Sequence, residues 1–429
     1  MTDTESTILT AKTVPEYIQK NSNKLQRHGV FDTKEDVVSA PEEEEEDPSF
    51  VPLASIASNL EHIVNATPIQ GGNVNYAFRV TFQNPSSLSS FSVFLKQAPE
   101  FVAIFGPDGF PLTSKRMQQE MDVYAEWNAL LGPELSRQYL PQIYFFDRTH
   151  MVVVMEFLDG YELLDQVLVS EQCHTVFQPI VATHLGDFLG KTHAATHSSR
   201  VDAVRRKYLT EHYENRAMRD IQLEFVFTKC YKEATEEQRA GLNVSDEFLK
   251  EVELMKQQYN GNTDSLVLCH GDIHPGSVMV DAANGKTKVI DPEFTVYGPP
   301  GLDVGSLLSG FVLGAIHQAF SNNTEAVNAI LKATQDIWHA YVKAMKEGGI
   351  SDDIIKSAEV EAVGFTVQEV CRTALEFAGG RKWLQFDDAG TKMVARKAAL
   401  QIVNKCMIAR HQGGMKLLLD EMKELCVAK

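Results

Sequence analysis

The sequence is most informative at LCHGDIHPGSVMV, residues 268–280, and at KVIDPEF, residues 288–294. The apolar residues around the first stretch predict a strand over 265–280, the Asp-Ala-Ala-Asn-Gly turn at 281–285 reverses the chain, and a second strand follows at 286–290. A strand, a turn and a return strand would bring Asp272 to the same end of one hairpin as Asp291 and Glu293. The pattern therefore predicts three carboxylates around a common cleft.

Such a carboxylate cluster suits phosphoryl transfer. One carboxylate can orient an attacking hydroxyl and accept its proton, while the others hold Mg²⁺ that bridges the phosphates and offsets their charge. A single aspartate in a turn is more often a cap or an Asx-turn. His-Gly-Asp followed by Asp-x-Glu at this spacing, downstream of a strand-rich segment, favours the functional interpretation.

Upstream of these motifs the sequence predicts a small α+β lobe. Strands are expected at 75–82, 91–96, 142–146 and 151–157, and a helix from a Thr113/Ser114 cap to 131. Lys96 ends the second of these strands, where it could reach ATP phosphates and pair with a helix carboxylate such as Glu120. A lysine at a strand end is often only a surface residue. The order of Lys96 and the other predicted elements along the chain favours the contact with ATP phosphates.

Two further segments of this lobe could contact a nucleotide. The turn GGNVN (71–75), with Gly72, Asn73 and Asn75, could lay backbone N–H groups over phosphates, although such a turn is usually only a hairpin turn. The last strand ends in MEFL (155–158), where Glu156, Phe157 and Leu158 would form a hinge that presents backbone groups to adenine.

Beyond residue 158 the sequence is mainly helical. Amphipathic stretches are expected at 176–198, 216–235, 246–259, 303–320, 325–347, 353–379 and 391–426. The predicted fold is α+β and bilobal: an N-terminal helix and acidic linker (1–50), a β-sheet N-lobe (51–158) and a helical C-lobe (159–429). The stretch GDFLGKT (186–192) resembles a Walker A loop but has three residues between its glycines where the motif needs four, so we interpret it as helix.

Composition narrows the classes of function. The chain has 429 residues and a net charge of −18, which is the wrong sign for gripping nucleic acid or anionic lipid. Six consecutive acids at 42–47 predict a solvated linker. The first residues show no signal-peptide pattern, no segment reaches the ~20 apolar residues that a bilayer requires, and the six cysteines form no Cys-x-x-Cys pair. We therefore expect a reduced, cytoplasmic protein.

Together these elements resemble the protein-kinase-like fold of small-molecule kinases, and among them the methylthioribose kinase family of methionine salvage. The resemblance runs from about residue 12 to 320 and continues more weakly to the end. It is carried by GGNVNYAFRV (71–80), KQAP (96–99), PLT (111–113), LGDFLGKT (185–192), HGDIHPGS (270–277) and VIDPEFTVYGPPGLDVG (289–305). Ser277 agrees with this family, because aminoglycoside and choline kinases usually carry a metal-binding Asn there.

The resemblance implies a role for each motif. Asp272 would be the base that orients the anomeric 1-hydroxyl of 5-methylthioribose, giving 5-methylthioribose 1-phosphate and ADP. ATP and Mg²⁺ would be the cofactors: Asp291 and Glu293 would hold the metal, Lys96 and Asn75 would contact the ATP phosphates, and 156–158 would form the hinge. Family members are often dimers, so a homodimer is one arrangement that the resemblance implies.

The sequence departs from this family where substrate is recognised. The family has two consecutive arginines, of which only Arg372 matches; it is expected to bind substrate, and Thr373 takes the second place. Phe110 stands where many relatives have Trp. Arg381 could compensate only if the backbone brings it inward. A kinase of the same fold acting on another sugar, an aminoglycoside or an amino alcohol therefore stays an alternative, as does a nucleotide-binding pseudoenzyme.

Overall fold

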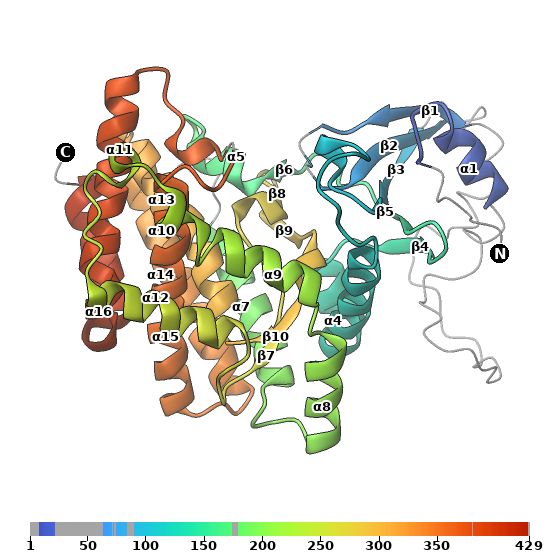
Figure 1. Cartoon of the computed structure of the whole chain (residues 1–429). Coiled ribbons are helices and arrows are strands. Elements are labelled where there is room, and N and C mark those ends of the chain that lie inside the picture. Colours follow the sequence, from blue (N-terminus) through green and yellow to red (C-terminus); the bar gives the residue numbers. More distant parts are fainter. Residues whose placement is uncertain are drawn as a thin grey trace. The chain divides into compact units, whose positions relative to one another are not determined.

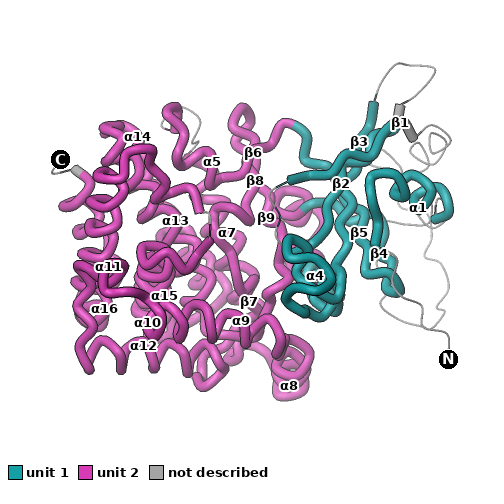
Figure 2. The backbone as a smooth tube through the Cα atoms, turned by 45° about the horizontal axis from the view of Figure 1, so that its top comes forward, with its two compact units in different colours: residues 1–125, 141–159 teal, residues 126–140, 160–429 magenta. Residues whose placement is uncertain are grey.

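The computed structural model describes residues 8–21, 63–70, 72, 74–83, 90–173, 179–379 and 381–427. The acidic run at 42–47 and Asn73 lie outside the described residues. The backbone divides into two compact units, residues 1–125 with 141–159 and residues 126–140 with 160–429 (Figure 2). Each unit is described by itself below.

The first unit is built on a five-stranded antiparallel sheet. Its strands are β1 (Ile63–Pro68), β2 (Tyr76–Gln83), β3 (Ser90–Gln97), β4 (Ile143–Asp147) and β5 (Val152–Glu156), in the spatial order β1-β2-β3-β5-β4. Alternating side chains of β2 and β3 point to one buried face, because successive residues of a strand face opposite sides of a sheet. That face includes Phe78, Val80 and Leu95.

Helix α1 (Val14–Lys20) belongs to this sheet unit (Figure 1). Val14 and Ile18 lie one helical turn apart and join the same apolar core as the strands. The Tyr17 hydroxyl donates to Asp147 at the end of β4, 2.8 Å away. The N-terminal helix is thus part of the core of the sheet unit.

Helix α4 (Arg116–Tyr139) starts later than the sequence predicted, whereas its first straight segment ends just before Gly132, as predicted. Ser114 donates from its backbone N–H and its hydroxyl to the Glu100 carboxylate, which holds 113–115 as a turn before the helix. The backbone of α4 kinks at Gly132, where φ is 74°. Its second half groups with the second unit, in which Trp127 packs edge-on against Phe188 at 5.3 Å.

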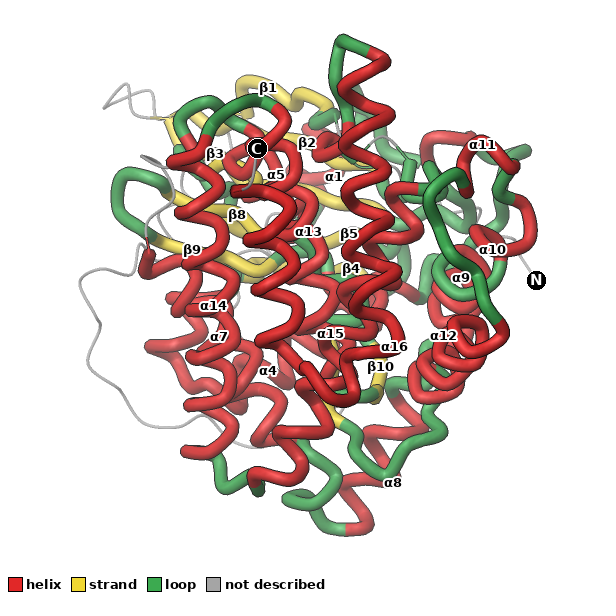
Figure 3. The backbone as a smooth tube through the Cα atoms, turned by 90° about the vertical axis from the view of Figure 1, so that its left-hand side faces the viewer, coloured by secondary structure: helices red, strands yellow, loops and turns green. Residues whose placement is uncertain are grey.

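The second unit is mainly helical, and its longest helices run side by side (Figure 3). The helices are α5 (Leu164–Val169), α7 (Pro179–Thr196), α8 (Ala203–His212), α9 (Arg216–Phe225), α10 (Lys229–Glu233), α11 (Glu236–Arg239), α12 (Asp246–Tyr259), α13 (Gly301–Phe320), α14 (Thr324–Glu347), α15 (Asp352–Ala374) and α16 (Ala389–Val427). Helix α13 is buried almost throughout and packs against α14, α15 and α16. It therefore forms the centre of this unit.

The Walker-like stretch lies inside α7, as the glycine spacing predicted. Gly186 and Gly190 bring α7 close to α14: a Cβ on Gly186 would lie 2.2 Å from the carbonyl oxygen of Ile337. These glycines serve helix packing. No helix in the described parts of the chain is both long and apolar enough to span a bilayer.

Short strands frame the motif loops of this unit. β7 (Val267–Cys269) pairs with β10 (Val296–Gly298), whereas β8 (Val278–Asp281) pairs with β9 (Lys286–Val289) and β6 (Glu162–Leu163). The predicted β8–β9 hairpin is confirmed. The prediction of one strand over 265–280 is wrong, because residues 270–277 leave the sheet as a loop. The predicted α+β class, with an antiparallel sheet unit and a helical unit, is confirmed.

Candidate active site

The loop at 270–277 is anchored by Asp303 near the start of α13. The Asp303 carboxylate accepts the backbone N–H groups of His270 at 2.7 Å and Gly271 at 3.0 Å. His193 on α7 lies 3.2 Å from the same carboxylate, through Nε2. Burial would raise the pKa of Asp303, but these partners outweigh it and lower that pKa. Asp303 stays ionised and holds the loop at both amides.

Gly271 lets this loop approach the second motif. Its φ is +87°, and a Cβ there would lie 1.9 Å from the carbonyl oxygen of Phe294. On the other side of the contact, His270 Nε2 lies 2.9 Å from the carbonyl oxygen of Ile290. The loop that carries Asp272 therefore packs directly against residues 290–294. The two motifs are neighbours as predicted, but through a loop contact and not through the end of one hairpin.

Asp272 lies in a mixed environment of apolar groups, a carboxylate and two guanidinium groups. Its side chain is 25% exposed. Burial raises the pKa of Asp272 to about 6, in spite of the opposing charges of Arg381 and Arg372 and a hydrogen bond from Gln222. At neutral pH the carboxylate is mostly ionised and is basic enough to accept a proton.

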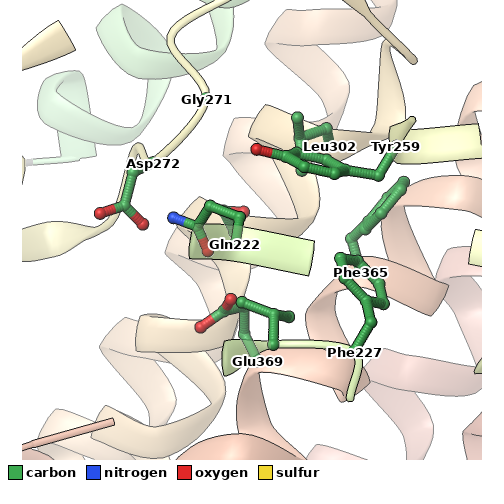
Figure 4. Close-up of a pocket in the computed structure, with 10 residues that line it drawn as sticks. Gln222, Phe227, Tyr259, Gly271, Asp272, Leu302, Phe365 and Glu369 are labelled. Carbon is green, nitrogen blue, oxygen red and sulfur yellow. The ribbon is translucent and has the colours of Figure 1, made fainter. Parts of the chain in front are cut away.

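A pocket opens beside Asp272 (Figure 4). Phe227, Tyr259 and Phe365 provide an aromatic wall, and the amide of Gln222 points toward the Asp272 carboxylate. Glu369 on α15 supplies a further polar group. The pocket therefore combines an apolar surface with a few converging polar groups, which is typical of small-molecule sites.

Glu369 joins two arginines beside this pocket. Arg372 Nη2 lies 2.7 Å and Arg381 Nη1 lies 3.2 Å from the same carboxylate oxygen, and all three side chains are largely buried. Burial would raise the pKa of Glu369, but the two guanidinium groups lower it. The backbone thus does bring Arg381 inward, next to Arg372. Sequence analysis did not single out Glu369, although it lies one helical turn before Arg372.

Asp291 and Glu293 belong to one turn after β9. Asp291 is exposed and has a left-handed backbone with φ of 60°, while Glu293 is buried within the 3-10 turn η4 (Pro292–Phe294). The Asn215 amide donates to the carbonyl oxygen of Glu293 at 2.9 Å and fixes this turn. Two carboxylates on one turn form a hard-oxygen donor set, which fits Mg²⁺.

Ser277 closes its own loop. Its hydroxyl accepts the His274 N–H at 2.9 Å and donates to the His274 carbonyl oxygen at 2.8 Å. The side chain is 4% exposed. In this structure the Ser277 hydroxyl shapes the 270–277 loop.

Lys96 in the first unit forms the predicted ion pair. Its Nζ lies 2.8 Å from the Glu120 carboxylate on α4, and both side chains are buried. Lys96 lies in the middle of the sheet, opposite Ala77 on β2 and Val153 on β5. The pairing of strand lysine and helix glutamate is therefore confirmed.

Arg116 organises the segment around Asn75, a role that the sequence analysis missed. Its fully buried guanidinium donates to the Asn75 side-chain oxygen at 3.1 Å and to several carbonyl oxygens, among them Pro99 at 2.8 Å and Val74 at 3.2 Å. Gly72, in the same segment, is exposed. Arg116 thus fixes the backbone before β2, at Val74, and after β3, at Pro99.

Strand β5 ends at Glu156, and local contacts partly fix the conformation of residues 156–158. The Glu156 carboxylate accepts the Gln142 N–H at 3.0 Å, and the Phe157 carbonyl accepts the Asp159 N–H at 2.9 Å. The guanidinium of Arg79 lies 4.3 Å from the centre of the Phe157 ring. Leu158 is buried.

Comparison with known proteins defines the class of enzyme. The sequence profile of the phosphotransferase enzyme family matches residues 66–336, so the chain belongs to that family. The predicted enzyme class, a phosphotransferase, is confirmed.

Several curated relatives carry a more specific name. The chain is 26% identical over 362 residues to "Methylthioribose kinase" of Geobacillus kaustophilus, covering 80% of this chain and 86% of that protein. It is 28% identical over 315 residues to "Methylthioribose kinase 1" of Oryza sativa subsp. japonica, covering 68% of each. Among solved structures, a choline/ethanolamine kinase family protein of Mesorhizobium loti matches with a TM-score of 0.42 and 13% identity, covering 83% of this chain and 92% of that one.

Proposed function

We propose that the protein transfers the γ-phosphoryl group of ATP to the 1-hydroxyl of 5-methylthioribose. One observation carries this proposal: an anchored loop presents Asp272 beside both a carboxylate turn and an aromatic-walled pocket. The relatives named methylthioribose kinase support the choice of sugar, because they match about four fifths of the chain. Methionine salvage is the pathway that this activity would serve.

Asp272 is the proposed base. Its carboxylate accepts the hydroxyl proton while the hydroxyl oxygen bonds to the γ-phosphorus. The bond from that phosphorus to the β-γ bridging oxygen breaks, and ADP leaves with the electron pair. Because phosphoryl transfer needs little covalent help from the protein, positioning supplies most of the rate enhancement.

The remaining residues would bind ATP and Mg²⁺. Asp291 and Glu293 would hold Mg²⁺, which neutralises phosphate charge when it is bound. Lys96 and Asn75, with the backbone at Gly72 and Asn73, would contact the phosphates, and Glu156, Phe157 and Leu158 would contact the adenine. Glu120 orients the Lys96 ammonium.

Arg372 and Arg381 are the proposed sugar-binding cations. Each guanidinium presents several N–H donors in a fixed plane, which suits ribose hydroxyls next to Asp272. Glu369 orients both of them. Arg381 would thereby supply a second guanidinium where Thr373 cannot.

A panel of alcohol acceptors tests the proposal. Purified protein with ATP and Mg²⁺ is incubated separately with 5-methylthioribose, ribose, glucosamine, an aminoglycoside and choline, and ADP release is followed. The proposal expects the highest kcat/KM for 5-methylthioribose.

The second candidate function is a kinase of the same class with a different alcohol, and Thr373 is the observation that favours it. Higher kcat/KM for another acceptor would establish that candidate. ADP release with none of the acceptors, together with retained nucleotide binding, would indicate the pseudoenzyme instead.

A further inference from the structure

A second pocket of the helical unit has three cations in its wall. It is bordered by Arg381, Lys392 and Arg396 together with Thr373 and Glu376. These residues come from the C-terminal end of α15, the segment that follows it, and the first turns of α16. None of the carboxylates proposed for catalysis or metal binding lines this pocket.

The charges in this wall are unbalanced. Lys392 Nζ lies 2.9 Å and Arg396 Nη1 lies 3.7 Å from the same oxygen of Glu376, so two cations share one carboxylate. The third cation, Arg381, pairs with Glu369, which Arg372 also contacts, and it interacts electrostatically with Asp272. Neither of these carboxylates lines the pocket. Partial burial makes such an excess costly, because fewer water molecules compensate each charge.

Thr373 adds an unmatched hydrogen-bonding group. Thr373 is 7% exposed, and its hydroxyl has no hydrogen-bond partner among the residues that the structure describes. A buried polar group without a partner loses its hydration without compensation, so such groups are rare unless a ligand or water completes them. A bound oxyanion would supply the missing acceptor.

We propose that this pocket binds a phosphate group, either as inorganic phosphate or as a phosphate monoester. Arg396 already donates from Nε and Nη2 to the carbonyl oxygens of Ala374 and Gln238. The Arg381 guanidinium, the Lys392 ammonium and the Thr373 hydroxyl still give more donors than the two oxygens of the Glu376 carboxylate can accept. The three or four oxygens of a phosphate match them, and its negative charge offsets the excess of the wall. Arg381 is shared with the proposed sugar-binding group, whereas Thr373, Lys392 and Arg396 have no part in that group.

Calorimetric titration of the full chain tests this site. Sodium phosphate and, separately, glycerol 2-phosphate are titrated at low ionic strength, with saturating ADP present to fill the nucleotide site. We expect saturable binding at one site, with a dissociation constant below about 1 mM. Preference for glycerol 2-phosphate would identify a phosphorylated metabolite as the source, and equal binding would identify the phosphate group alone.

Two substitutions in the pocket test whether phosphate binds there. Lys392→Gln removes one wall cation, and Thr373→Val keeps the side-chain volume while it removes the hydroxyl. Each should weaken phosphate binding about tenfold, the effect of losing one such hydrogen bond. Lys416→Gln is the matched control, because Lys416 is an exposed lysine of α16 beyond the kink at Gly414 and outside the pocket. This variant should bind phosphate like the original chain.

Three results would overturn the proposal: absence of saturable binding, unchanged affinity in both pocket variants, or an equal loss of affinity in Lys416→Gln. None of these readouts involves sugar phosphorylation, so a failure here is distinct from a failure of the proposed function.

Discussion

At the scale of single residues, burial and the neighbouring arginines together set the pKa of Asp272. Its folded pKa of about 6 lies above the ordinary 3.8, so ionisation of this group costs folding stability as the pH rises through that window. A base must be ionised to accept a proton. We therefore expect kcat/KM to fall about tenfold per pH unit below pH 6.

Two variants separate the role of Asp272 as a base from a structural role. Asp272→Asn should lower turnover at least about 100-fold and leave ATP affinity nearly unchanged, because the amide cannot accept the proton. Arg381→Ala should move the acid limb to higher pH, since this guanidinium lowers the pKa of Asp272. Arg381→Lys, which keeps the charge, is the control. Full activity of Asp272→Asn would refute the assignment.

Lys96 and Glu120 form a buried ion pair. The contribution of this pair to the free energy of unfolding can be measured separately from the contribution of Lys96 to ATP binding. Removing one partner leaves an uncompensated buried charge, so Lys96→Met should cost about 3–5 kcal/mol of unfolding free energy. The double variant Lys96→Met/Glu120→Leu removes both charges and should recover most of that stability. ATP affinity should stay low in both variants. Urea unfolding and nucleotide titration measure the two effects, and recovered ATP binding in the double variant would contradict the proposed role of Lys96.

At the scale of elements, the 270–277 loop depends on Gly271. An alanine there would adopt a positive φ and also place its Cβ 1.9 Å from the Phe294 carbonyl oxygen. Gly160 has a similar φ of +77° but open space around its Cβ position. Gly160→Ala therefore measures the backbone cost alone, about 1 kcal/mol.

Gly271→Ala should cost clearly more stability than Gly160→Ala and should lower kcat, because the loop that carries Asp272 must move. Thermal unfolding and steady-state kinetics of the two variants provide the comparison. Equal effects of the two substitutions would show that the contact between the two motifs is not required.

The contact between α13 and α15 contains a buried carboxylate. Glu361 accepts the Gly301 N–H at 3.2 Å, and burial raises its pKa from 4.5 to about 7. A raised carboxylate pKa means that stability is complete below pH 4.5 and is lost as the pH rises to 7, by about 3 kcal/mol.

Glu361→Gln keeps an acceptor for Gly301 and cannot ionise. Its unfolding free energy should therefore exceed that of the original chain at pH 8, and the difference should shrink at pH 5. Chemical unfolding at both pH values tests this expectation; a difference independent of pH would contradict it.

At the scale of the whole molecule, the sequence predicted that segments 270–277 and 290–294 are neighbours but not the contacts that hold them. The β8–β9 hairpin was predictable because it is read from a few adjacent residues. The anchor of the 270–277 loop was not predictable in this way: His193 and Asp303 are 110 residues apart and meet only through packing of α7 and α13. Long-range pairs of this kind leave no periodic signal in the sequence.

Arg381 illustrates the same limit. Its position after α15 does not indicate where its side chain points. Only the structure shows that Arg381 and Arg372 pair with the same carboxylate, that of Glu369. The single strand predicted over 265–280 was also wrong, because residues 270–277 form a loop that Asp303 holds between β7 and β8.

The most direct test of the central claim is the identity of the phosphorylated product. Purified protein is incubated with ATP, Mg²⁺ and 5-methylthioribose, and the product is examined by ³¹P NMR, with Asp272→Asn in parallel. The account predicts a phosphate coupled to the anomeric proton with the original chain and no product with the variant. A phosphate on another hydroxyl, or equal product from Asp272→Asn, would contradict it.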